Sequence, residues 1–313
     1  MAKVKNATAA APAKKKSFRE ICKANIGFFY ILPWLIGFCI FKLYPMGSSL
    51  FYSFTDYNLF KGINVIGTLQ NYIDIFNTPK IVKAMGVTFK YSFMTVPLKL
   101  VFALFIAYIL NFKIKGVNFF RTAYYVPSIL GGSVAIAVLW KAVFRDDGLL
   151  NTLLGFFGVE GPSWLSDPKY ALFVICLLRV WQFGSAMVIF LAALKGVPQD
   201  LYEAAAIDGA GKWRQFFSVT VPLITPVIFY NLVTQLVQAF QEFNGPYIIT
   251  RGGPRNSTTL VSLLIYNSAF KDYNMGMASA MAWVLFIVLM IFTVIAFLSQ
   301  KYWVFYSDDD GGR

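Results

Sequence analysis

The stretch PQDLYEAAAIDGAGKWRQFFSVTVPLITP, residues 198–226, is a long segment of polar and small residues between two strongly apolar runs. Asp200 and Glu203 favour a helix N-terminus, where negative charge is stabilised. Gly209 ends this helix, because glycine accepts the left-handed backbone of a helix end, and a second short helix follows from Trp213. The stretch therefore predicts a helix-turn-helix loop. Its surface suits docking into another protein, and an amphipathic loop lying on lipid headgroups is the alternative.

The composition places the chain among membrane proteins. Hydrophobic residues make up 58% of the chain and charged residues only 14%, whereas about a quarter of the residues in a soluble domain are charged. The net charge of +13 could suggest nucleic-acid binding, but the basic residues cluster beside apolar runs, so we expect no nucleic-acid partner. Histidine is absent, and Cys22, Cys39 and Cys176 lack the spacing of metal ligands. No metal site is predicted.

Six apolar runs are each close to the roughly 20 residues that a helix needs to cross the hydrocarbon core. We therefore predict an all-α fold, a polytopic membrane helical bundle with six transmembrane helices. The runs cover residues 26–50, 87–112, 119–144, 170–194, 221–243 and 277–299.

The distribution of lysine and arginine indicates the orientation in the membrane. Basic residues gather in the N-terminal tail, in the turn with Lys113 and Lys115, and in the loop after Lys195, so these segments and both termini are expected in the cytosol. The predicted organisation is a basic, lipid-contacting cytosolic tail at 1–24, a transmembrane domain at 25–303 and a cytosolic tail at 304–313. The domain includes the cytosolic loop at 198–220 and an extracytoplasmic loop at 244–274, in which residues 260–270 are either an interfacial helix or a seventh, re-entrant segment.

Polar side chains recur through the fifth run at steps of three and four residues, which would place them along one face of one helix. Unpaired polar groups in hydrocarbon are costly, so this face must meet protein, water or substrate. Hydrogen bonding between helices would explain one or two such residues. A longer set rich in glutamine favours a wet path, and amide groups suit hydroxyl-rich ligands such as sugars. The set comprises Asn231, Thr234, Gln235, Gln238, Gln241 and Glu242.

Arg179 is a charged residue deep in the fourth run. It lies about ten residues, or ~15 Å, from the outer end of the run, near the bilayer midplane, where a charge is costly and usually functional. Two roles are open for it: an ion pair with Glu242, or a counter-ion for an acidic sugar. Lys99 in the second run is another positive group at similar depth. Trp181 is either a packing residue or a ring that stacks on a sugar face.

Residues 203–205, Glu-Ala-Ala, with Gly209 and Pro222 beyond them, resemble the EAA loop of binding-protein-dependent ABC importers. With the TRGGP turn at 250–254 and the order of the six runs, residues 26–303 are similar to carbohydrate importer permeases, specifically to the first permease subunit of the maltose and glycerol-phosphate type. The resemblance implies the type I ABC importer permease fold in a bacterial cytoplasmic (inner) membrane. It also implies that the loop contacts an ATPase through Glu203, Ala204, Ala205, Asp208 and Gly209.

The resemblance further implies a transport subunit that is not an enzyme. A second homologous permease and an ATPase homodimer or pair would complete the transporter, with ATP and magnesium bound by the ATPase and no cofactor in this chain. An extracytoplasmic solute-binding protein would deliver a sugar or oligosaccharide, which would cross by alternating access.

The predicted substrate path combines the polar residues of the fourth and fifth runs with positions implied by the maltose relative. Nearly all positions shared with that relative carry different residues here, so the sugar stays unidentified, and Arg179 alone suggests a uronate-containing one. The path comprises Ser128, Arg179, Trp181, Gln182, Ser185, Asn231, Gln235, Gln238, Gln241 and Glu242.

Two rival classes make different demands on the sequence. A secondary transporter or channel would show inverted repeats or a chain of ionisable residues for ion coupling. A membrane-embedded enzyme would show a nucleophile beside a base, or a set of metal ligands. Neither pattern is evident in the sequence.

Overall fold

The computed structural model describes residues 26–112 and 115–306. In these residues the regular structure is helical, with isolated β-bridges and no β-sheet. The predicted tail at 1–24 and residues 307–313 lie outside the described residues. The chain divides into two compact units, residues 1–51 and 52–313, which are described separately.

The first unit is built on one continuous helical run. Helix α2 (Ile26–Phe38), the π-helical turn η1 (Cys39–Leu43) and α3 (Tyr44–Ser53) follow one another without a break. The stretch Tyr30–Ser53 has 24 residues and a mean hydropathy of 1.3. It is long and apolar enough to cross a membrane, as predicted for residues 26–50.

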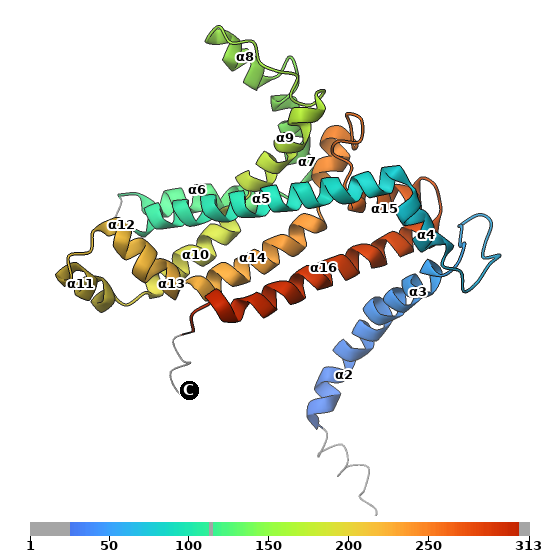
Figure 1. The fold of residues 1–313 in the computed structure, drawn as a ribbon, viewed down its shortest axis with the longest axis horizontal. Coiled ribbons are helices and arrows are strands. Elements are labelled where there is room, and N and C mark those ends of the chain that lie inside the picture. Colours follow the sequence, from blue (N-terminus) through green and yellow to red (C-terminus); the bar gives the residue numbers. More distant parts are fainter. Residues whose placement is uncertain (1–25, 113–114, 307–313) are drawn as a thin grey trace, which may run out of the picture. The chain divides into compact units, whose positions relative to one another are not determined.

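Two long helices frame the second unit. Helix α5 (Pro79–Asn111) has 33 residues with a mean hydropathy of 2.2, and α16 (Met275–Trp303) has 29 residues with a mean hydropathy of 2.9. Helix α14 (Thr225–Phe240) lies between them and packs against both (Figure 1). Helices α5 and α16 match the second and sixth predicted runs.

The other three predicted runs are each broken into two helices. Three helical stretches, Tyr30–Ser53, α5 and α16, are each long and apolar enough to be one span. If each bent pair counts as one further span, length and composition give up to six spans. This number agrees with the prediction, although the membrane crossings themselves stay predicted. The pairs are α6 (Val117–Leu130) with α7 (Val134–Val143), bent by 104°; α9 (Pro168–Trp181) with α10 (Gly184–Gly196), bent by 45°; and Lys212–Leu223 with α14, bent by 67°.

Glycine permits close packing where the first two pairs bend. A Cβ on Gly131 would collide with the Gln182 side chain, and a Cβ on Gly184 would collide with the backbone of Tyr124. Ser133 then caps α7, because its Oγ accepts a hydrogen bond from the backbone N–H of Ala135 at 3.2 Å. The two bends therefore meet at one place in the unit.

The main core lies where α5 packs against α9, α10 and α14. Ala103 and Ala107 of α5 are fully buried, and their small side chains allow the close helix approach that membrane bundles use. Met187 and Phe190 of α10 fill the space opposite.

A second core lies at the other end of α5. Helix α4 (Gln70–Asn77) and α15 (Val261–Phe270) pack against α5 and α16 through residues such as Ile75, Ala84 and Met281. Helix α15 has ten residues and is about 15 Å long, too short to cross a membrane. The backbone N–H of Val261 donates to Thr88 Oγ1 at 3.0 Å, which fixes the start of α15 on α5.

The loop that precedes α4 is organised by one carboxylate. Asp56 Oδ1 accepts hydrogen bonds from the backbone N–H groups of Val65 at 2.8 Å and Asn64 at 2.9 Å. These bonds favour the charged form and hold the pKa of Asp56 below its ordinary value.

Candidate functional site

Helix α11 (Gln199–Ile207) presents the predicted coupling residues on its surface. Glu203, Ala204, Asp208 and Gly209 are exposed, and Ala205 is half-buried. Gly209 has a φ of 78°, in the left-handed region that glycine adopts without strain. The predicted short helix and its glycine stop are therefore present in the structure.

Two side-chain hydrogen bonds hold α11 and the turn after it against the segment that follows. The hydroxyl groups of Tyr202 and Thr220 lie 2.8 Å apart, and Gln215 Nε2 donates to the carbonyl oxygen of Ala210 at 3.0 Å. That segment leads directly into α14, so α11 is tied to the base of the fifth run. It consists of α12 (Lys212–Gln215), the π-helical turn η2 (Phe216–Thr220) and α13 (Val221–Leu223).

An aromatic contact ties the same segment to the end of α5. The ring of Phe216 meets the ring of Tyr108 edge-on at 4.7 Å between centroids, a favourable geometry for aromatic pairs. Trp213 is 73% exposed and stacks on Phe217 beside this contact. A force applied to α11 would therefore reach both α5 and α14.

Arg179, in the last turn of α9, is surrounded by three of the predicted path residues. Its Nη1 donates to Gln182 Oε1 at 3.0 Å, and its Nη2 donates to Gln238 Oε1 at 2.9 Å. Its Nε lies 3.7 Å from Glu242 Oε2. The predicted Arg179–Glu242 ion pair is thus present. The side chains are only 22% and 12% exposed, so water screens the pair weakly.

Ser128, Gln182 and Ser185 join the two bent helix pairs. Ser128 Oγ donates to the carbonyl oxygen of Gln182 at 3.1 Å and accepts from the backbone N–H of Ser185 at 2.9 Å. Gln182 Nε2 donates to the carbonyl oxygen of Gly131 at 3.1 Å. These three residues lie close to Arg179 as predicted, but their hydrogen bonds in this conformation stabilise the bends.

Trp181 packs inside the protein in this conformation. Its ring lies 5.7 Å from the ring of Trp140, and it borders a small core of Ala137, Leu178 and Ile249. Of its two predicted roles, this environment matches packing.

The prediction that six polar residues share one face of one helix is wrong for the last two. Helix α14 ends at Phe240, Gln241 is its C-terminal cap with a ψ of 6°, and Glu242 lies beyond it. Glu242 Oε1 accepts from the backbone N–H of Gly245 at 3.0 Å, which stabilises the turn. Because the chain leaves the helix here, Glu242 reaches Arg179 and Gln241 stays exposed.

The remaining polar residues of α14 have different surroundings. Thr234 Oγ1 donates to the carbonyl oxygen of Tyr230 at 2.9 Å, within its own helix. Gln238 is exposed and reaches Arg179, whereas Asn231 and Gln235 are buried. Asn231 and Gln235 therefore lie apart from the Arg179 group, which consists of Arg179, Gln182, Gln238 and Glu242.

Gln235 instead contacts a buried lysine. Lys99 of α5 is 3% exposed, and its Nζ donates to Gln235 Oε1 at 2.7 Å. Asn231 Nδ2 donates to the carbonyl oxygen of Val227 at 3.1 Å, but Asn231 Oδ1 has no hydrogen-bond partner. A buried ammonium group is costly unless it is hydrogen-bonded, so we expect the bond to Gln235 to stabilise the fold.

A small internal cavity lies beside Arg179. Its volume is about 10 Å³, which is room for about one water molecule, and its lining includes Tyr91, Gln182 and Glu242. Tyr91 is fully buried and its hydroxyl has no hydrogen-bond partner. Tyr91 is absent from the predicted path, because an aromatic residue within an apolar run shows no distinguishing pattern in the sequence.

Metal binding finds no support in the described residues. They contain no group of three or more histidine, cysteine, aspartate or glutamate residues close enough to hold an ion. Of the cysteines in this part of the chain, Cys39 is exposed and Cys176 is buried, and both are free thiols.

Comparisons with known proteins cover almost the whole chain. The family described as binding-protein-dependent transport system inner membrane component matches residues 63–304. The probable ABC transporter permease protein YesP of Bacillus subtilis is 47% identical over 96% of this chain and 98% of its own length. The trehalose/maltose transport system permease protein MalF of Thermococcus litoralis is 33% identical over 90% of this chain and 94% of its own length.

A solved structure has the same fold. It is the bacterial alginate ABC transporter in complex with an alginate pentasaccharide-bound periplasmic protein. The matching chain is 20% identical, superposes with a TM-score of 0.79, and the match covers 91% of this chain and 97% of that one. At this identity the match establishes the fold.

Proposed function

Because this chain belongs to the family of binding-protein-dependent transport system inner membrane components, we propose that it is the transmembrane permease subunit of an ATP-driven importer. A solute-binding protein delivers the sugar, and the subunit moves it into the cytosol by alternating access. The family and the named permease relatives confirm the predicted carbohydrate ABC permease, a transport component and not an enzyme. With its apolar helices, the family assignment indicates a multi-pass protein of the inner membrane.

The observation that carries the mechanism is the exposed helix α11 and its attachment to two spans. Its outer surface is available to a partner. Tyr202 bonds to Thr220 of η2, the turn that leads toward α14, and Phe216 of the same turn contacts Tyr108 of α5. An ATPase that grips Glu203 and closes would move both helices. We place α11 in the cytosol with both termini, next to an ATPase homodimer or pair that binds ATP and magnesium.

The Arg179 group is the proposed sugar-binding part of the path. Arg179, Gln182, Gln238 and Glu242 offer charged and amide groups of the kind that hold hydroxyl-rich ligands. The cavity beside them, about 10 Å³ in volume, is too small for a sugar ring in this conformation. A sugar therefore needs a second state in which α9 and α14 separate, and a second homologous permease would provide the opposite wall.

Copurification tests the coupling helix. Gly209→Pro should lower the amount of ATPase that copurifies with the tagged subunit roughly tenfold or more. Proline cannot adopt a φ of 78°, and it lacks the backbone N–H that Gly209 donates to Ala206 at 3.0 Å. The second permease should still copurify. Gly209→Asn is the matched control, because asparagine tolerates the left-handed region.

The importer proposal would be contradicted if the chain purified without partners and moved solute into vesicles without ATP. Arg179, Lys99 and Glu242 would then be candidates for ion coupling.

Uptake assays test the predicted preference for acidic sugars. Arg179→Gln should reduce uptake of uronate-containing oligosaccharides roughly tenfold, the effect of losing one charge-assisted hydrogen bond, and should change uptake of neutral ones by less than about twofold. Arg179→Lys, which keeps the positive charge, should reduce uptake of these acidic sugars less than Arg179→Gln does. An equal loss for acidic and neutral sugars would show that Arg179 acts only on the structure.

A further inference from the structure

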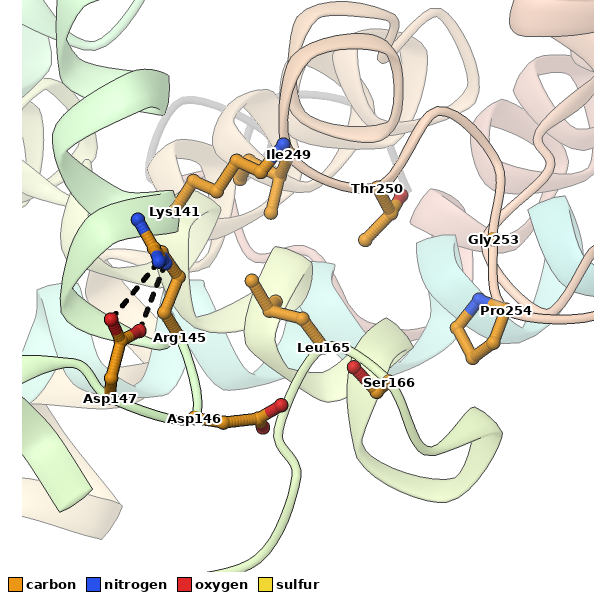
Figure 2. Close-up of a pocket in the computed structure, with 10 residues that line it drawn as sticks. All are labelled: Lys141, Arg145, Asp146, Asp147, Leu165, Ser166, Ile249, Thr250, Gly253 and Pro254. Carbon is orange, nitrogen blue, oxygen red and sulfur yellow. Dashed lines mark hydrogen bonds and ion pairs between the residues drawn. The ribbon is translucent and has the colours of Figure 1, made fainter.

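A large open cleft lies on the protein surface where α7, the loop after it and the TRGGP turn come together. Its volume is about 710 Å³, within the range of small-molecule sites. Figure 2 shows Lys141 and Arg145 on one side, Leu165 and Ser166 below, and Thr250 with Gly253 and Pro254 on the other side.

The charged groups of the cleft are not all paired. Arg145 forms a two-point ion pair with Asp147, from Nε to Oδ1 and from Nη2 to Oδ2, both at 3.0 Å (Figure 2). In the described part of the chain, the side chains of Lys141 and Asp146 make no hydrogen bond or ion pair, although both line the cleft. The cleft thus offers one free ammonium group and one free carboxylate.

These groups suit a sugar acid. The Lys141 ammonium group can donate to a ligand carboxylate, and Asp146 can accept hydrogen bonds from ligand hydroxyl groups. Leu165 and Pro254 add apolar surface, on which the C–H face of a sugar ring can pack.

The walls of the cleft are held in place. Asn151, in α8 (Leu149–Phe156), donates from Nδ2 to the carbonyl oxygen of Asp146 at 3.1 Å and accepts from Trp164 Nε1 at 2.7 Å. On the other side, Thr258 Oγ1 donates to the carbonyl oxygen of Gly253 at 2.7 Å. A site that is formed in advance binds a ligand without the cost of ordering its walls.

The cleft and the inner cavity lie one helical turn apart on α7. Ala137 lines the cavity beside Arg179, and Lys141 lines the cleft, a rise of about 6 Å along the helix axis. Between them lies the buried apolar core of Ala137, Leu178 and Ile249. This core closes the direct route from the cleft to Arg179 in the present conformation.

We propose that the cleft is an outer binding site for a carboxylate-bearing oligosaccharide, which it holds before the apolar core separates and the sugar reaches Arg179. Lys141 binds a ligand carboxylate and Asp146 binds ligand hydroxyl groups. This site rests on the proposed import of an acidic sugar and adds a second place where that sugar binds, outside the Arg179 site. The cleft has the volume of a saccharide site, whereas a protein-docking surface is larger and flatter.

Binding measurements on the complete transporter in lipid nanodiscs test the cleft. The probes are alginate trisaccharide, which carries a carboxylate on each ring, and neutral maltotriose. Saturation-transfer NMR at millimolar saccharide concentrations measures their binding. Lys141→Gln should weaken binding of the acidic trisaccharide roughly tenfold and change maltotriose binding by less than about twofold. Lys141→Arg should restore the affinity. Lys61→Gln, which removes an exposed lysine outside the cleft, should have no effect.

Three results would contradict the proposal that the cleft binds an acidic saccharide. If Lys141→Gln and Lys61→Gln bind the acidic trisaccharide equally well, the cleft is not its site. If Lys141→Gln changes only the stimulation of ATPase activity by the solute-binding protein, the cleft is a protein-docking surface. If the wild type binds neither saccharide while the ATPase still copurifies, both the proposed sugar substrate and the proposed cleft site are wrong. Loss of the ATPase from the purified complex would instead contradict the importer proposal.

Discussion

Reversing the charge of Glu203 to lysine is expected to lower ATP-driven uptake roughly 100-fold, because a like charge placed in a protein interface costs several kcal/mol. Glu203 lies exposed on α11, away from the Tyr202 and Gln215 hydrogen bonds that hold this helix. The fold should therefore survive while the contact with the ATPase is lost. Substrate-stimulated ATPase activity of the purified transporter and sugar uptake by cells measure the effect.

The matched control is Glu160→Lys, the same charge reversal at an exposed residue in the loop between α8 and α9. We place this loop on the extracytoplasmic side, so uptake should stay within about twofold of the wild type, as is usual for exposed sites. Near-normal uptake by Glu203→Lys would contradict a role of α11 in docking. Equal loss in both variants would point to a general effect of charge on insertion or expression.

Replacing Gln235 by leucine is expected to lower the free energy of unfolding by about 3 kcal/mol, because it leaves a buried charge without a partner. Lys99 Nζ donates to Gln235 Oε1, and no other hydrogen-bond partner of this ammonium group occurs in the described residues. The double variant Lys99→Met with Gln235→Leu should recover most of the loss, since two apolar side chains of similar size can replace a buried polar pair. Unfolding by SDS in mixed micelles measures all three proteins.

Thr234→Val is the control for this series. Thr234 lies on the same helix, but its hydroxyl bonds to a carbonyl oxygen of that helix, so the expected loss is below about 1 kcal/mol. A loss for Gln235→Leu as small as that of Thr234→Val would mean that water, and not Gln235, satisfies Lys99.

The sequence predicted the helix of the 198–226 loop and its end because the signals are local. Asp200 near the start of α11 and Gly209 after its end act within one turn of the helix. The apolar runs are equally local, since membrane crossing depends on the length and composition of a continuous segment. The relatives confirm the family inferred from these patterns.

The polar path was predicted less well because side-chain environments depend on partners distant in sequence. A regular spacing through residues 231–242 suggested one polar face, but the helix ends at Phe240 and the next residues turn toward α9. Gln235 consequently contacts Lys99, which is 136 positions away in the chain. Tyr91 was missed because an aromatic residue in an apolar run shows no signal of its own.

Local patterns in this chain thus predict its class, its apolar helices and the short helix of the 198–226 loop, since each depends on residues that are neighbours in sequence. Tertiary structure alone decides which polar groups meet. The 45° and 104° bends bring Gln182 and Ser128 together, and the end of α14 directs Glu242 to Arg179. The physical reason is that a buried polar group must find its partner in space, wherever in the chain that partner lies.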